Sequence, residues 1–157
     1  MPKLQGPDMR NTIAEALKTA MKAQDKRSLS TLRMIQSAIK DRDIANRGIG
    51  KGAAGDDEVL QILAKMVKQR EESARAFDQG GRPELAAQER DEIEIIRAFQ
   101  PKQLGDDEVM MAARAAMAET GASGPKDMGR VMAVLKERFA GQMDFGKASS
   151  VVKSLLQ

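Results

Sequence analysis

The 157-residue chain contains neither cysteine nor histidine. It therefore has no disulfide, thiolate metal site, cysteine nucleophile, Ser-His-Asp triad or HExxH metalloenzyme motif. Its net charge of +3 is unevenly placed: residues 1–55 carry a net +6, residues 56–100 a net −4 and residues 101–157 a net +1. Basic ends around an acidic middle favour an anionic partner.

No stretch of the sequence approaches the 18 consecutive apolar residues that a membrane-spanning helix needs. The first ten residues, MPKLQGPDMR, lack the apolar core of a secretory signal peptide. On these two grounds we expect a cytoplasmic protein with no membrane partner.

Apolar residues recur at helical spacing in the first hundred residues. The first expected helix covers residues 8–24, with Asp8 as its N-cap, and the second starts near Ser28 and ends in the glycine-rich segment 48–55, which we interpret as a mobile loop. A third helix is expected from Asp56 to the Gly80-Gly81 pair, and a fourth from Pro83 to Pro101.

Three shorter helices are expected in the rest of the chain, at about 106–119, 126–139 and 146–156. No strand-like alternation is present, so the predicted fold class is all-α. We expect an N-terminal antiparallel helical bundle over residues 1–100 and a small three-helix tail domain over residues 101–157, because short connections favour antiparallel neighbours.

Two glycine-rich segments resemble phosphate-binding motifs. Residues 50–55 match GxGxxG, but a helix is expected before them where the dinucleotide fingerprint needs a strand. Residues 141–148 fall one residue short of a P-loop, since Ala148 replaces the Ser or Thr that binds Mg²⁺. The second turn is open to two interpretations, a phosphate contact at a helix start or a plain interhelical turn.

A basic stripe is the least generic feature of the second helix. Lys26, Arg33, Lys40 and Arg47 recur every seven residues and so share one side of the helix, beside the apolar face. Their long stems either cover the edge of the core with their charged ends in water, or form a ladder of about 10 Å per step that contacts successive phosphates.

Acidic pairs elsewhere do not form a convincing catalytic site. Glu71, Glu72, Asp91, Glu92 and Glu94 stand among Lys and Arg, as on a solvated helix face. We expect no catalytic residue, no metal and no cofactor.

Several motifs in register carry a family resemblance over roughly residues 8–157. They are Lys26-Arg27, Ser30–Arg33, Ala38–Lys40, Phe99–Leu104, Glu119–Ala122, Lys126–Met132, Gly141 and Asp144–Lys147. In these motifs the chain resembles the GatB/YqeY family, whose members include stand-alone proteins and the tail region of the tRNA-dependent amidotransferase B subunit. It departs from the family pattern at Gly105, often Ser or Thr, and at Phe99, often Tyr.

The resemblance implies an all-α fold in two parts whose tail contacts tRNA. Carried onto this sequence, it implies Lys126, Gly129, Arg130, Lys136 and Lys147 as RNA-binding candidates, with Gly129 allowing either close backbone approach or tight helix packing. The stripe is a separate inference from the residues.

Three functions remain open from the sequence. The first is a non-catalytic tRNA-binding or tRNA-delivery module, with tRNA and a tRNA-handling enzyme as partners. The second is a protein-interaction adaptor that docks through methionines of the tail, namely Met110, Met111, Met128, Met132 and Met143. The third is an accessory part of a glutamine-dependent carbon–nitrogen ligase, the activity that the family label suggests but no residue here supports.

Overall fold

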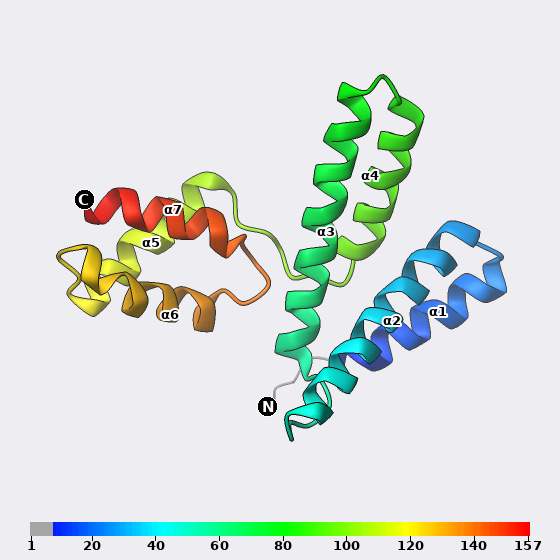
Figure 1. Cartoon of the computed structure of the whole chain (residues 1–157), viewed down its shortest axis with the longest axis horizontal. Coiled ribbons are helices and arrows are strands. Elements are labelled where there is room, and N and C mark those ends of the chain that lie inside the picture. Colours follow the sequence, from blue (N-terminus) through cyan, green and yellow to red (C-terminus); the bar gives the residue numbers. More distant parts are fainter. Residues whose placement is uncertain (1–7) are drawn as a thin grey trace. The chain divides into compact units, whose positions relative to one another are not determined.

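The computed structural model describes residues 8–157, and in that range the all-α prediction is confirmed (Figure 1). No described helix is both long and apolar enough to cross a membrane. The described elements are α1 (Met9–Ala23), α2 (Lys26–Gly48), α3 (Asp56–Gln79), α4 (Pro83–Arg97), α5 (Asp106–Thr120), the short 3₁₀-helix η1 (Pro125–Asp127), α6 (Met128–Arg138) and α7 (Phe145–Leu156).

Side-chain caps set the helix starts. Asp8 is the N-cap of α1, as predicted, and its carboxylate accepts a hydrogen bond from the backbone N of Arg10 at 3.0 Å. α2 begins at Lys26, two residues before the predicted start, because Asp25 caps it and accepts from the backbone N of Ser28 at 3.2 Å.

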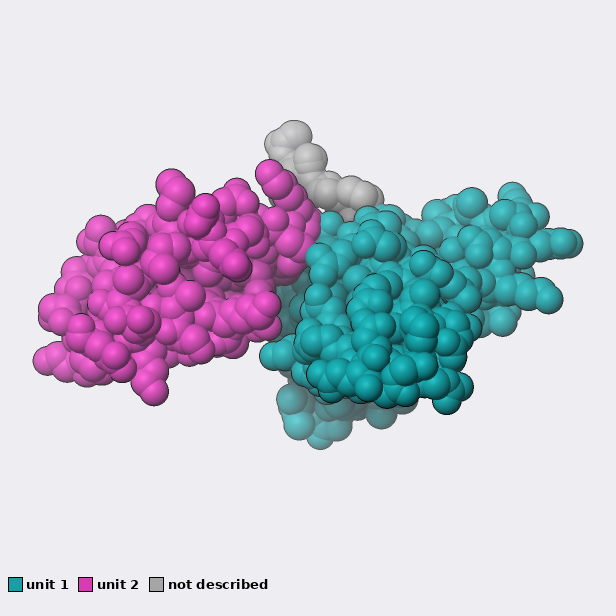
Figure 2. Space-filling model, turned by 90° about the horizontal axis from the view of Figure 1, so that it is seen from above, with its two compact units in different colours: residues 1–100 teal, residues 101–157 magenta. Residues whose placement is uncertain are grey.

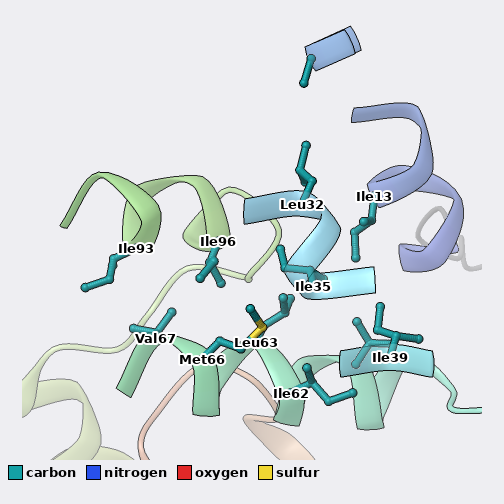
Figure 3. Packing of buried hydrophobic residues seen from close by; sticks show 12 residues of the cluster. Ile13, Leu32, Ile35, Ile39, Ile62, Leu63, Met66, Val67, Ile93 and Ile96 are labelled. Atoms are coloured by element: carbon teal, nitrogen blue, oxygen red, sulfur yellow. The ribbon is translucent and has the colours of Figure 1, made fainter. Parts of the chain in front are cut away.

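Two compact units divide the chain between Gln100 and Pro101 (Figure 2). In the first, α1 pairs antiparallel with α2 and α3 pairs antiparallel with α4 (Figure 1). Ile35 of α2 is fully buried at the centre of their shared core and points toward Leu63 of α3, and Ile13 and Ile96 bring α1 and α4 into the same cluster (Figure 3).

The second unit has a hydrophobic core of its own, built by α5, α6 and α7. Small side chains at the contacts let these short helices approach closely, since Ala113, Ala116 and Ala148 are at most 1% exposed. The larger buried residues of this core are Val131, Leu135, Val152 and Leu156.

The glycine-rich segment between α2 and α3, predicted to be mobile, is held by side chains from both helices. Asn46, only 4% exposed, donates from Nδ2 to the Gly52 backbone oxygen at 3.1 Å and to Glu58 Oε2 at 2.9 Å. The Ala54 backbone N donates to Asp43 Oδ1 at 2.8 Å. With the bond from Lys51 Nζ to Glu58 Oε1 at 2.8 Å, these contacts tie the loop to the ends of both helices.

Candidate nucleic-acid interface

The basic stripe of Lys26, Arg33, Lys40 and Arg47 is exposed along the whole of α2. At 100° per residue, Arg33 lies about 160° around the helix from the fully buried Ile35. The four side chains face solvent, and Leu29, about 40° around the helix from Arg33, packs against the core, so the N-terminal half of the stripe lies beside the apolar face. This orientation favours charged ends free to meet a ligand over stems that cover the core.

Three of the stripe cations have no partner in the part of the chain that the structure describes. Lys26, Arg33 and Lys40 make no ion pair or side-chain hydrogen bond with any of residues 8–157. Arg47 acts on a carboxylate only through its charge, as the weakest of the causes that lower the pKa of Asp43.

Other arginines of the same helix are paired with acids. Arg27 forms an ion pair with Asp91 of α4, and Arg42 lies 3.6 Å from Glu58 of α3. Between Lys26 and Lys40 the sequence contains no acidic residue. Arg27 and Arg42 thus pair with acids of the protein, whereas Lys26, Arg33 and Lys40 carry positive charge that no acid among residues 8–157 pairs with.

The polar cluster at the end of the α1–α2 pair was not foreseen from sequence. Arg10 of α1 meets Asp43 at 2.7 Å, and this hydrogen bond, followed by that of the Ala54 amide, holds the pKa of Asp43 below its usual value. Lys51 donates to Glu58 at 2.8 Å and, with Asn46, lowers the pKa of Glu58. The cluster fixes the C-terminal end of the stripe.

The tail candidates divide into exposed lysines and an engaged arginine. Lys126 in η1, Lys136 in α6 and Lys147 in the first turn of α7 are exposed and have no side-chain partner in the described part of the chain. Gly129 is also exposed, and a Cβ built there meets no atom within 4 Å, so helix packing does not require glycine at this position. Its surface is open to an approaching ligand.

Arg130 is exposed as well, but its guanidinium is paired within the tail. Its guanidinium pairs with Asp127 and donates to the backbone oxygen of Thr120 at 3.1 Å, at the C-terminal end of α5. Asp127 is 7% exposed and also accepts from the backbone N atoms of Ser123 and Gly124, at 2.9 and 3.3 Å. These bonds, with the Ser123 amide as the largest cause, lower the pKa of Asp127 to about 2.

Asp127 is therefore the organising residue of the α5–α6 connection, and sequence reasoning missed it. The sequence signal was that Asp127 lies three residues after Gly124, at the start of a helix. A carboxylate at such a position can accept from the free backbone amides of the preceding turn. Gly121 ends α5 at φ +66°, in the left-handed region that favours glycine.

The turn that resembled a P-loop is closed by the protein itself. Asp144 caps α7 and its Oδ1 accepts from the backbone N of Gly146 at 2.8 Å and of Lys147 at 3.4 Å. These are the amides that would cradle a phosphate, so the interhelical turn is the better interpretation. The GxGxxG segment follows helix α2, not a strand.

The tail methionines are divided between the core and the surface. Met132 and Met143 are 8% and 6% exposed and belong to the core, Met110 and Met128 are partly exposed, and Met111 is 70% exposed. Across residues 8–157 no three His, Cys, Asp or Glu side chains are grouped so that they could hold a metal ion.

The chain matches the Yqey-like protein family over residues 10–156. It belongs to this family. A relative from Clavispora lusitaniae named "Altered inheritance of mitochondria protein 41, mitochondrial" is 42% identical over 53% of this chain and 46% of its own length. The protein of the same name from Saccharomyces cerevisiae is 32% identical over 53% of this chain and 43% of its own length. An uncharacterised Schizosaccharomyces pombe protein is 31% identical over 61% of this chain and 75% of its own length.

The matched region spans about half the length of the mitochondrial relatives. Their names overturn the cytoplasmic expectation, because they describe these relatives as mitochondrial proteins. The expectation was wrong because it tested only for an apolar secretory signal and a membrane span. A mitochondrial transit peptide is amphipathic and Arg-rich, and that test does not detect it.

Proposed function

We propose that this Yqey-like protein is a non-catalytic module that binds tRNA, with the basic stripe of α2 as its principal contact with the phosphate backbone. The observation that carries the proposal is the contrast on α2 between paired and unpaired cations. Arg27 and Arg42 face acids of the protein, whereas Lys26, Arg33 and Lys40 face solvent with no partner in residues 8–157. Unneutralised cations aligned on one helix suit a polyanion.

A structured RNA fits this surface better than an extended single strand. Single-strand binders stack bases on aromatic side chains, and the chain has no Trp, no Tyr and four Phe. Folded RNA is recognised mainly through its shape and backbone. Successive stripe residues are about 10 Å apart along the axis, so a rigid helix presents four charges to a rigid backbone.

The exposed lysines of the tail, Lys126, Lys136 and Lys147, form a second proposed contact, with the open backbone at Gly129 beside the first of them. Arg130 is left out of this contact because its guanidinium is held by Asp127 and Thr120. Delivery of the bound tRNA to a tRNA-handling enzyme is the role that these contacts would serve.

Fluorescence anisotropy with labelled tRNA tests the proposal directly. A variant in which Lys26, Arg33, Lys40 and Arg47 are replaced by Gln should bind at least about tenfold more weakly than the wild type, because it removes four phosphate contacts. The matched control replaces Lys18, Lys22, Lys65 and Arg75, four exposed cations on α1 and α3, with Gln. Equal losses in both variants would point to net charge alone and refute the stripe.

A further inference from the structure

An open hollow lies along the N-terminal half of α2, beside the stripe. Its volume is about 460 Å³, and it is lined by Lys26, Leu29, Ser30, Arg33, Met34 and Ser37. It therefore combines two stripe cations with two hydroxyl groups and an apolar side. Contacts to phosphates alone would need only the cations.

The polar side of the hollow is free to bind a ligand. Ser30 and Ser37 follow Lys26 by four and eleven residues, and Arg33 follows it by seven, so all four lie on one side of the helix. Both serines are exposed, and neither side chain has a hydrogen-bond partner among the described residues. A serine hydroxyl donates one hydrogen bond and also accepts.

The apolar side of the hollow is anchored to the fold. Leu29 is partly buried and packs against the core of the first unit. Met34 is 39% exposed, and its sulfur accepts from Arg70 Nη2 of α3 at 3.5 Å. Leu29 and Met34 thus give the hollow a fixed apolar wall that can take the non-polar edge of a sugar.

Acids at the rim of the hollow are neutralised by arginines. A neighbouring hollow of about 540 Å³ is lined by Lys26, Arg27, Ser30 and Glu92. Glu92 accepts from Arg70 Nε at 2.9 Å, and the adjacent Asp91 pairs with Arg27. Lys26 and Arg33 at the rim pair with no acid among residues 8–157.

We propose that this hollow binds one phosphate of an RNA backbone together with the ribose attached to it, an inference that rests on the proposed function. Lys26 contacts this phosphate, and Arg33, about 10 Å further along the helix, contacts the next phosphate that the stripe meets. Ser30 and Ser37 exchange hydrogen bonds with the phosphate oxygens and the ribose 2′-OH, and Met34 and Leu29 contact the sugar. Because the 2′-OH distinguishes RNA from DNA, the hollow gives the stripe a preference for RNA.

The test compares an RNA hairpin with a DNA hairpin of the same sequence. The double variant Ser30→Ala and Ser37→Ala should bind the RNA hairpin about tenfold more weakly, since two hydrogen bonds are lost, and should bind the DNA hairpin nearly as well as the wild type does. Both changes raise helix propensity, so the variant remains folded. The control replaces Gln69 and Gln88, exposed on α3 and α4, with Ala.

A second measurement locates the RNA without any substitution. In protein labelled at its methionine methyl groups, the Met34 signal should shift when the RNA hairpin is added, while that of Met21, 54% exposed on α1, should stay in place. RNA binding with an unmoved Met34 signal, or a serine variant that retains full RNA preference, would overturn this inference and leave the proposed function standing. If the hairpin does not bind at all, both fail.

Discussion

Arg10 at the start of α1 reaches Asp43 near the end of α2 through two contacts of 3.1 and 2.7 Å, although 33 residues separate them in sequence. The same carboxylate accepts from the Ala54 backbone N at 2.8 Å. One acidic side chain therefore closes the first helical pair and holds the loop that follows α2. The glycine-rich segment is thereby attached to the end of α2.

Replacing Asp43 with Ala should release that loop. The Ala54 amide loses its acceptor, so its hydrogen exchange should accelerate by at least about tenfold, while the core of the first unit stays protected. Asp41→Ala is the control, since Asp41 is exposed on the same helix. An unchanged exchange rate at Ala54 in Asp43→Ala would show that the carboxylate does not hold the loop.

The tail unit should lose stability in acid through Asp127. Its folded pKa of about 2 lies below the ordinary value of 3.8, so its carboxylate stabilises the fold above about pH 4, and this contribution is lost as the pH falls from about 4 to 2. Asp127→Asn should lower the Tm of the tail by on the order of 5 °C at pH 7 and weaken its dependence on acid pH.

Thermal unfolding followed through the methyl signals of Val131 and Val152, both fully buried in the tail, measures this effect. Glu137→Gln removes the same charge from an exposed position of α6 and should leave the tail close to wild type. If the Tm of the tail depends on pH in both variants as it does in the wild type, the hydrogen bonds to Asp127 do not stabilise the α5–α6 connection.

Replacing Thr31 with Val should increase the stability of the first unit. Its side chain is buried at 1% exposure in α2, and its Oγ1 has no hydrogen-bond partner within residues 8–157. Thr31→Val keeps the shape and removes the unsatisfied hydroxyl, so the free energy of unfolding should rise by about 1 kcal/mol. In denaturant titrations, Thr19→Val, whose hydroxyl bonds to the Glu15 backbone oxygen, should show no such gain. A lower free energy of unfolding in Thr31→Val would contradict the prediction.

The tail contact predicts a second, smaller loss of tRNA affinity. Replacing Lys126, Lys136 and Lys147 with Ala should weaken binding without unfolding the tail, because none of the three side chains has a partner among the described residues. Arg130→Ala belongs in a separate experiment, since it opens the bonds to Asp127 and Thr120 and should lower the Tm of the tail. If the triple variant binds tRNA as tightly as the wild type does, the three lysines do not contact tRNA and the proposed interface is limited to the first unit.

Local sequence signals predicted the helices well. The N-cap at Asp8, Pro83 at the first position of α4 and the acidic starts of α3 and α5 are all features that neighbouring residues determine. The sequence GDDEV occurs twice, at residues 55–59 and 105–109, and begins α3 and α5. In the second copy Glu108 accepts from the Gly105 backbone N at 3.0 Å, whereas in the first copy Glu58 accepts from Asn46. Identical sequences thus acquire different partners from their surroundings.

Contacts between distant residues could not be predicted in this way. Periodicity gives no information on which acid meets which arginine, so the pairing of Arg10 with Asp43 and the burial of Asn46 were missed. The same limit applies to the stripe. The sequence gives the seven-residue spacing of its cations, but it does not show which cations of α2 pair with the acids of α3 and α4.

The salt dependence of tRNA binding tests the central claim most directly, because the claim is that the stripe of Lys26, Arg33, Lys40 and Arg47 contacts phosphates. Binding should be measured from 50 to 200 mM salt for the wild type, for the four-Gln stripe variant and for the Lys18, Lys22, Lys65 and Arg75 control. The slope of log Kobs against log salt should become shallower by roughly 3 in the stripe variant and stay unchanged in the control. Equal slopes for the wild type and the stripe variant would contradict the account.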